Sequence, residues 1–550
     1  MSPTPTVPLC LVAAAIFLVT NHVSGAPDAA DAAMAAIRPD GIRANMSFLA
    51  DDALEGRGTA TRGYEIAAKF MATRFEAMGF LPAGDNGTYF QQVPFRSMHP
   101  DPAQSSFTLT QDGKPETLTL GEDYIMSGDS RADTSVEAPV VFVGFGITAP
   151  DQNYDDYKNI DAKGKIVAFI SGAPNFTSSI KAHYSSRVGK AANAAAHGAV
   201  GIINLDDPSS ERRYSFSKRA RAMAFPQFRW LDKQGQPNDF LPQLQGNVSL
   251  SMAASKSIFH GSSHTADEVF AKLNAGKPVS FDLPVTARIH NVTRLADVHS
   301  PNVVAKLEGS DPTLKNEYVV YTAHLDHLGI GTPVNGDSIY NGALDNASGS
   351  AILIEMARAF SSLKPRSRRS ILLVAVTAEE AGLLGSDYFA HYPTVPRDSM
   401  VANVNTDEDP MFWPLADIIA FGAEHSSLEN DIQRACERMH LGESPDPAPE
   451  EVVFIRSDQY SFVKQGIPAV MPIPGVKSAD PNLNPGAIFG QWEQTRYHEP
   501  GDDMQQPGLN FDAAAQYARF VFLTGYYVSQ DKQRPTWNKN DFFGRHYATK

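Results

Sequence analysis

Along the second half of the chain, short apolar runs typical of strands alternate with longer runs that have the apolar spacing of helices, as in an α/β protein. Short, almost wholly apolar runs predict buried strands at 318–322, 370–377 and 401–406. Longer runs with apolar residues at helical spacing predict helices at 351–360 and 511–527. This rhythm predicts a mostly parallel sheet covered by helices. The carboxyl ends of parallel strands meet at one edge, and a functional site is expected there.

The first half of the chain has a different pattern. An amphipathic helix is predicted over 64–78, and short alternating stretches over 89–119 predict hairpins. The block from 121 to 288 has strands and an Ala-rich helix of its own, which predicts an inserted smaller α/β domain. Its histidines are scattered and are expected to be structural or solvent-exposed: His183, His197 and His260.

Composition narrows the class of protein. At 550 residues the chain is expected to form two or three domains, and its net charge of −15 argues against nucleic acid or an anionic membrane surface as the main partner. Residues 7–20 are apolar and are followed by small residues near Gly25 and Ala26. This pattern predicts a signal peptide over 1–26, with an uncleaved anchor as the alternative. We therefore expect a secreted or periplasmic protein that has no membrane span after removal of the signal and no intramolecular disulfide, because Cys10 lies in that segment and only Cys436 remains.

Histidine and carboxylate side chains follow the predicted strands. His324 and Asp326 end the first strand, and Asp345 lies on a turn before the helix at 351. A lone pair of this kind is more often a surface or helix-capping pair. The chain, however, supplies further candidates in order, which are Glu379, Glu380, Asp407 and His498.

Two imidazoles and three carboxylates form a ligand set suited to zinc, with cobalt or manganese as alternatives. Five ligands are too many for one tetrahedral ion with an open position, but they fit two ions that share one bridging carboxylate. In the dipeptide Glu379-Glu380 one carboxylate can bind a metal while its neighbour acts as a general base. A lone Glu-Glu pair is usually a solvated turn, but this one follows a buried strand.

These motifs resemble peptidase family M28, whose members are mainly zinc aminopeptidases with two co-catalytic ions. The motifs that carry the resemblance are His324-Leu-Asp326, Asn341-Gly-Ala-Leu-Asp345-Asn-Ala-Ser-Gly349, Glu379-Glu380, Asn405-Thr-Asp407 and Tyr497-His498-Glu-Pro-Gly-Asp502. The resemblance covers 291–530 and extends to the stretch at 52–57. Gln459 departs from it, since many relatives have histidine there.

The resemblance implies a three-layer, phosphorylase/hydrolase-like peptidase domain with an inserted protease-associated domain. Its expected divisions are 1–26 (signal), 27–120 (N-terminal part of the peptidase domain), 121–288 (insert), 289–535 (catalytic domain) and 536–550 (tail). It implies two zinc ions, with Asp345 bridging, His324 and Asp407 on one ion, and Glu380 and His498 on the other.

The resemblance also implies roles for residues around the metals. Glu379 would be the general base, Asp326 would orient His324, and Asp502 would orient His498. Tyr497 is a candidate oxyanion donor, with a packing role as the alternative. The extra histidines His327 and His391 are not expected to be ligands.

The predicted function is that of an exported metallo-aminopeptidase that removes N-terminal residues from peptides. One alternative keeps the fold and changes the reaction, to a glutaminyl cyclase or to a carboxypeptidase or dipeptidase. A carboxypeptidase needs cations for the substrate carboxylate, and the nearby candidates are Arg456 and Arg496. A third alternative is a binding protein on an inactive peptidase scaffold. Residue preference, the oligomeric state and the role of the insert lie beyond the sequence.

Overall fold

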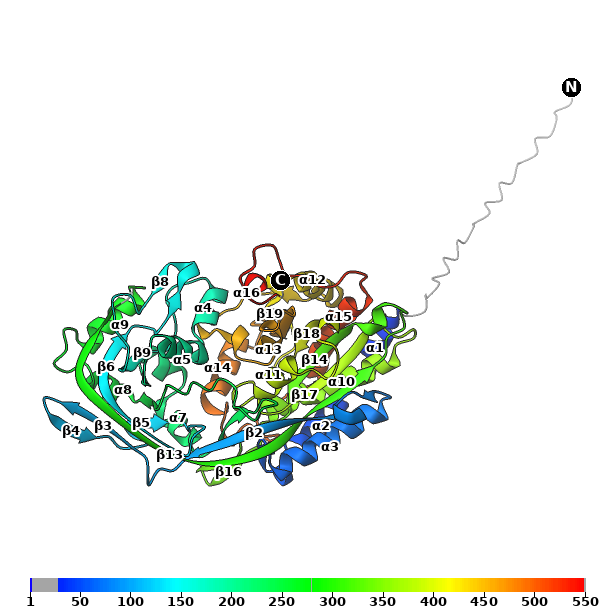
Figure 1. Cartoon of the computed structure of the whole chain (residues 1–550). Coiled ribbons are helices and arrows are strands. Elements are labelled where there is room, and N and C mark those ends of the chain that lie inside the picture. Colours follow the sequence, from blue (N-terminus) through cyan, green and yellow to red (C-terminus); the bar gives the residue numbers. More distant parts are fainter. Residues whose placement is uncertain (2–27, 278, 549–550) are drawn as a thin grey trace.

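The computed structural model describes residue 1 and residues 28–277 and 279–548. The predicted signal peptide therefore lies outside the described residues, apart from Met1. Figure 1 shows two layered regions joined by one long curved strand, β13 (Ser280–Leu307). Within the described residues, every helix is too short or too polar to cross a lipid bilayer.

The larger region is built on a sheet whose central strands are parallel. Its strands run in the order β11, β2, β13, β17, β14, β18, β21, β19 and β20, with β1 also paired to β13. The parallel strands at the centre are β14 (Tyr318–His324), β17 (Ser370–Val376), β18 (Met400–Asn405) and β21 (Ala469–Pro474). The others are β1 (Leu81–Pro82), β2 (Phe90–Pro100), β11 (Gln227–Trp230), β19 (Asp417–Phe421) and β20 (Gly442–Glu443). The predicted α/β class, with a mostly parallel sheet at its centre, is confirmed.

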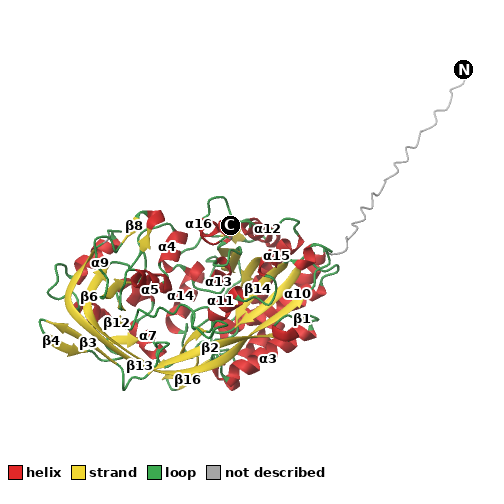
Figure 2. Cartoon of the chain, viewed as in Figure 1, coloured by secondary structure: helices red, strands yellow, loops and turns green. Residues whose placement is uncertain are grey.

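Helices cover both faces of this sheet (Figure 2). Alternate residues of β17 belong to different cores, with Leu373 and Ala375 in one and Leu372 and Val374 in the other. This is the two-residue periodicity expected of a strand that is buried on both faces. One face packs against α1 (Ala29–Ala36), α2 (Pro39–Leu49), α3 (Arg62–Ala77), α10 (Ser348–Ser362), α12 (Leu428–Met439) and α15 (Phe511–Gln530). The other packs against α11 (Leu384–His391), α13 (Gln459–Val463) and α16 (Phe542–Tyr547).

The smaller region has its own sheet and its own core. Its strands run in the order β4, β3, β13, β6, β9, β10, β12 and β5. They are β3 (Ser106–Gln111), β4 (Lys114–Thr117), β5 (Tyr124–Met126), β6 (Asp133–Val143), β9 (Ile166–Ile170), β10 (Gly201–Leu205) and β12 (Asn247–Leu250). Its helices are α4 (Ser178–Tyr184), α5 (Arg187–Ala196), α6 (Pro208–Arg213), α7 (Phe216–Ala222), α8 (Met252–Ser257) and α9 (Ala266–Asn274).

The strand β13 belongs to both sheets. Residues 285–290 pair with β3, and residues 293–303 pair with β2. The second sheet thus begins at β3, before the expected start of the insert at 121, and the expected boundary at 288 and 289 falls inside a continuous strand. That the insert forms a separate domain of the protease-associated type stays a prediction.

Candidate metal centre

The predicted ligands lie where strands of the main sheet end. His324 is the last residue of β14, Glu379 and Glu380 follow β17, and Asp407 follows β18. Asp345 lies in a turn, Ala343–Ala347, directly before α10, with a non-helical φ of −108° and ψ of 92°. His498 follows α14 (Pro485–Thr495) with a φ of 55°. The parallel strands thus carry ligands that are distant in the sequence to one edge of the sheet.

Asp345 lies between two histidines. His324 Nε2 is 3.1 Å from Asp345 Oδ1 and 2.9 Å from Asp407 Oδ1. On the other side, His498 Nε2 is 3.2 Å from Asp345 Oδ2 and 3.0 Å from Glu380 Oε2. The two oxygens of one carboxylate therefore face two separate histidine–carboxylate pairs, which is the arrangement expected of a bridging ligand.

Electrostatics in the cluster follow from burial and proximity. Burial raises the pKa of Asp345, but hydrogen bonds with His324 and His498 outweigh it and hold the pKa well below its usual range. Burial lowers the pKa of His324, and the nearby carboxylates, Asp407 first, overcome this and raise it well above its usual value. The cluster thus concentrates negative charge that favours cations.

Glu379 lies beside the ligands in a strongly acidic setting. Its carboxylate comes within 4.8 Å of ligand atoms of His324 and Glu380. Burial, reinforced by Asp407 and Asp458 and opposed by His324, raises the pKa of Glu379 well above its usual range. A carboxyl group with this tendency to hold a proton suits a general base that later acts as an acid.

Asp326 contacts the backbone of Glu379 as well as His324. Its Oδ1 accepts a hydrogen bond from the Glu379 backbone amide at 3.2 Å, and its Oδ2 accepts one from the Thr59 hydroxyl at 3.2 Å. His324 Nδ1 lies 3.1 Å from the Asp326 backbone carbonyl and 4.0 Å from its carboxylate. The carbonyl is therefore the nearer partner of the imidazole, and the carboxylate fixes the backbone that carries Glu379.

Two other residues named from the sequence also lie at the site. The ring of Tyr497 stacks on that of His498, with centroids 3.9 Å apart. Asp502 accepts hydrogen bonds from the backbone amides of Leu344 and Asp345, each at 3.0 Å, so its carboxylate holds the Asp345 turn rather than His498.

Sequence reasoning missed the position of His327. The ring is buried, and its Nδ1 lies 2.6 Å from Glu380 Oε1 and 3.9 Å from Asp345 Oδ2. The available signal was its place directly after the His-x-Asp motif. His391, the other extra histidine, is half-exposed and lies against the backbone carbonyl of Asp387.

The donor set fits divalent metal ions. Three groups of candidate ligand atoms cluster here: His324 with Asp345 and Asp407, His327 with Asp345 and Glu380, and His324 with Glu379 and Glu380. Among the described residues, Glu380 Oε1 and both ring nitrogens of His327 are buried without a hydrogen-bond partner, although His327 Nδ1 lies next to Glu380 Oε1. Buried polar atoms that converge without hydrogen bonds are explained by a cation that they share.

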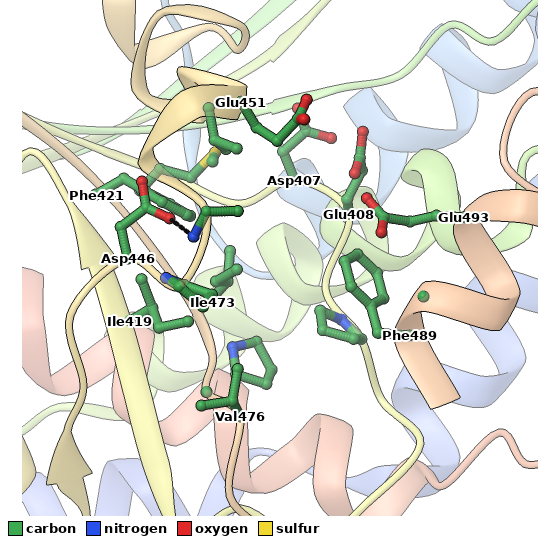
Figure 3. Close-up of a pocket in the computed structure, with 18 of the residues that line it drawn as sticks. Asp407, Glu408, Ile419, Phe421, Asp446, Glu451, Ile473, Val476, Phe489 and Glu493 are labelled. Atoms are coloured by element: carbon green, nitrogen blue, oxygen red, sulfur yellow. Dashed lines mark hydrogen bonds between the residues drawn. The ribbon is translucent and has the colours of Figure 1, made fainter. Parts of the chain in front are cut away.

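A cavity of about 320 Å³ opens from the cluster at Asp345, Asp407 and His498. In Figure 3 the carboxylates of Asp407, Glu408 and Glu493 gather on one side of it. Apolar side chains line much of the rest, among them Ile419, Phe421, Ile473, Val476 and Phe489.

Arg456 also lines this cavity, with Nη1 3.9 Å from Glu451. Four acids outside the predicted ligand and base residues line it as well: Glu408, Asp446, Glu451 and Glu493. Burial raises the pKa of Glu408 to about 8, so this carboxyl group is mostly protonated at neutral pH.

Comparison with known proteins agrees with the motifs and the geometry. Residues 302–523 match the model of peptidase family M28, which confirms the predicted resemblance to that family. The chain is 24% identical over 489 residues to a protein described as an aminopeptidase from Pseudomonas aeruginosa, covering 86% of this chain and 76% of that one.

Two further matches differ in how much they cover. A "Probable zinc metalloprotease" of Pyrenophora teres f. teres is 27% identical over 296 residues, covering 48% of this chain and 59% of that relative, less than two thirds of its length. The solved structure of an aminopeptidase from Aneurinibacillus sp. strain AM-1 is 19% identical with a TM-score of 0.55, covering 92% of this chain and 97% of that one. This second match shows a shared fold.

Proposed function

We propose that the protein is an exported metallo-aminopeptidase that binds two zinc ions, with cobalt or manganese as possible replacements, and removes N-terminal residues from peptides. The observation that carries the proposal is the position of Asp345, whose two carboxylate oxygens each face one histidine–carboxylate pair. His324 and Asp407 would hold one ion, Glu380 and His498 the other, and Asp345 both. The family match and the relatives described as aminopeptidase and zinc metalloprotease support it.

Different residues around this cluster would carry out different steps of peptide hydrolysis. The metal ions, when bound, would lower the pKa of water and polarise the scissile carbonyl. Glu379 would take the proton from the attacking water and pass it to the nitrogen of the leaving amine. Asp326 holds the Glu379 backbone for this transfer. Tyr497, whose ring stacks on His498, would donate its hydroxyl to the developing oxyanion.

The charge of the cavity favours a free N-terminus over a C-terminal carboxylate. A carboxypeptidase needs an unopposed cation. Burial lowers the pKa of Arg456, but Tyr497, Glu408 and Glu451 outweigh burial and raise the pKa, so the guanidinium already has partners. Arg496, the other candidate, donates a hydrogen bond to the Gly501 carbonyl. The carboxylates that line the cavity attract the ammonium group of a peptide instead.

Hydrolysis of aminoacyl anilides and their N-blocked equivalents tests this proposal. We expect cleavage of the free substrates only, loss of activity with a chelator, and recovery with zinc. Glu379→Gln should lower kcat by about 10²–10⁴-fold while the bound zinc stays unchanged. Cleavage of blocked substrates in preference to free ones, or full activity of Glu379→Gln, would contradict it. Export is tested separately, by N-terminal sequencing of the mature protein from the periplasm or culture medium, which should begin near residue 26 or 27.

A further inference from the structure

A segment that runs from the smaller region into the main sheet borders the metal centre and contacts the main region at both of its ends. We call residues 214–230 the strap; it contains α7 and β11. At its start, the ring of Tyr214 meets the ring of His498 edge-on, with centroids 6.2 Å apart. In α7, Arg221 Nη2 donates to Glu499 Oε1 at 2.6 Å, and Lys218 Nζ donates to the Gln494 carbonyl at 3.2 Å. The first half of the strap is therefore fixed to the loop that carries His498.

The second half of the strap is fixed to the main sheet. β11 pairs with β2 in antiparallel register, and Trp230 Nε1 donates to Asp387 Oδ2 at 2.9 Å. Between these anchors the ring of Phe225 meets the ring of Tyr340 edge-on, at 5.2 Å. A Cβ at Gly331 would lie only 2.4 Å from the Phe225 ring, so the ring packs directly on the backbone of β15 (Gly329–Val334).

The strap closes one wall of a second cavity, of about 220 Å³, that also borders the metal centre. Glu380 and His327 line it on the side of the centre, whereas the first cavity is lined by Asp345, Asp407 and His498. Its apolar walls come from the strap, through Phe225, Pro226 and Phe228, and from the opposite side, through Leu328 and Ile330. The two cavities thus reach the same cluster through different ligands.

A peptide cleaved at this centre has to place a residue on each side of the scissile bond. The acidic side chains that line the first cavity, Asp446, Glu451 and Glu493 among them, suit the N-terminal residue with its ammonium group. The side chain of the residue that follows the scissile bond would then bind in the second cavity. A cavity of roughly 150 Å³ holds benzene, so one of about 220 Å³ has room for a large apolar side chain.

We propose that the second cavity receives the side chain that follows the scissile bond, and that the strap gives the enzyme a preference for large apolar residues there. This inference rests on the proposed aminopeptidase activity. It gives the inserted segment a direct part in substrate selection.

Release of leucine from the peptides Leu-Phe-Gly and Leu-Gly-Gly tests the inference, because only the residue after the scissile bond differs. We expect the zinc-loaded full-length enzyme to have a higher kcat/KM for Leu-Phe-Gly. Phe225→Ala should lower the ratio of the two kcat/KM values by about tenfold, since the substrate ring loses apolar contact. The matched control is Phe240→Ala, a half-buried phenylalanine of the smaller region that packs on Arg131 outside this cavity and should leave the ratio unchanged.

A second variant keeps the test valid if Phe225→Ala does not fold. Ile330 is 57% exposed, so Ile330→Glu should fold, and it should shift the preference toward Leu-Lys-Gly. An unchanged preference in Phe225→Ala and in Ile330→Glu, or an equal loss on both substrates, would overturn the inference. If the wild-type enzyme releases no leucine from any of these peptides, the aminopeptidase proposal itself fails.

Discussion

His327 Nδ1 lies 2.6 Å from Oε1 of Glu380, and no residue in the described part of the chain forms a hydrogen bond with the ring. Glu380 therefore has a histidine on each of its oxygens, because His498 lies 3.0 Å from Oε2. This places His327 in direct contact with a predicted ligand that it was not expected to touch. We infer that His327 either binds the same ion as Glu380 or holds the Glu380 carboxylate in place.

Replacement of His327 should therefore weaken one metal site more than the other. We expect His327→Ala to reduce affinity for the ion held by Glu380 and His498 by about 10–100-fold, as is typical when a residue that supports a ligand is lost. Zinc titration against a competing chelator measures this. His391→Ala is the matched control and should bind zinc as the wild type does. Two ions bound with wild-type affinity in His327→Ala would contradict this role.

Ser457 supports the other predicted site. Its hydroxyl donates to Asp407 Oδ2 and accepts a hydrogen bond from Asn405 Nδ2 at 2.8 Å. Ser457→Ala should raise the zinc concentration needed for half-maximal activity by about 10–100-fold, with activity recovered at high zinc. Ser461→Ala removes an equally buried hydroxyl, one bonded to Ser386, and should leave the zinc requirement unchanged. An unaltered zinc requirement in Ser457→Ala would argue against this support.

Arg57 joins the N-terminal segment to the loops of the metal centre. Its buried guanidinium donates to the backbone carbonyls of Leu49, Leu325, Asn341 and Gly342. Burial lowers its pKa to about 10, with Asp326 opposing the shift, so the group is still charged at neutral pH.

Arg57→Met leaves these buried carbonyls without donors, and we expect it to lower the free energy of unfolding by about 3 kcal/mol or more. Denaturant unfolding of the zinc-loaded protein measures the loss. Arg62→Met, at an exposed arginine five positions later, should change it by less than about 0.5 kcal/mol. Equal free energies of unfolding for the two variants would show that the Arg57 hydrogen bonds do not contribute to the stability of the fold.

Lys190 gives the smaller region a pH-dependent stability. The ammonium is buried, donates to the carbonyls of Ile170 and Gly172, and has its pKa lowered by burial to about 7, with Asp156 opposing. Because its folded-state pKa lies below its ordinary value of 10.5, the unfolded chain binds more protons between about pH 7 and 10.5. The Lys190 contribution to stability therefore rises with pH in that window.

Lys190→Met should remove this contribution. The unfolding free energy of the wild type minus that of Lys190→Met should increase by at most about 1.4 kcal/mol per pH unit above pH 7. Denaturant unfolding at pH 7, 8 and 9 measures the difference, with Lys277→Met as a control at a solvent-exposed lysine. A difference that is constant across these pH values would refute the assignment.

The positions of the main strands could be predicted because each is a short apolar run. His324, Glu380 and Asp407 could be placed together because each ends or follows such a run, and the carboxyl ends of parallel strands meet at one edge. His498 was a candidate by residue type, but its place could not be derived that way, since it lies in a polar loop in a left-handed conformation; the resemblance supplied its pairing with Glu380.

Other features depend on contacts between distant residues. The contact of Arg221 with Glu499 spans 278 residues, and no local pattern marks it. β13 passes from one sheet to the other, so exposed residues such as Leu295 interrupt its burial pattern, and the boundary expected from the sequence falls where the strand continues. From the sequence, Arg57 is predicted to be an ordinary polar residue of a turn. Its partners are backbone carbonyls, which every residue has, so no residue type marks them in the sequence.

The most direct test of the proposed metal centre is anomalous X-ray scattering at the zinc edge from crystals of the zinc-loaded protein. Two peaks are expected on the two sides of the Asp345 carboxylate, about 3.5–4 Å apart. One should lie next to His324 and Asp407, and the other next to Glu380 and His498. A single peak, or peaks away from Asp345, would contradict the account.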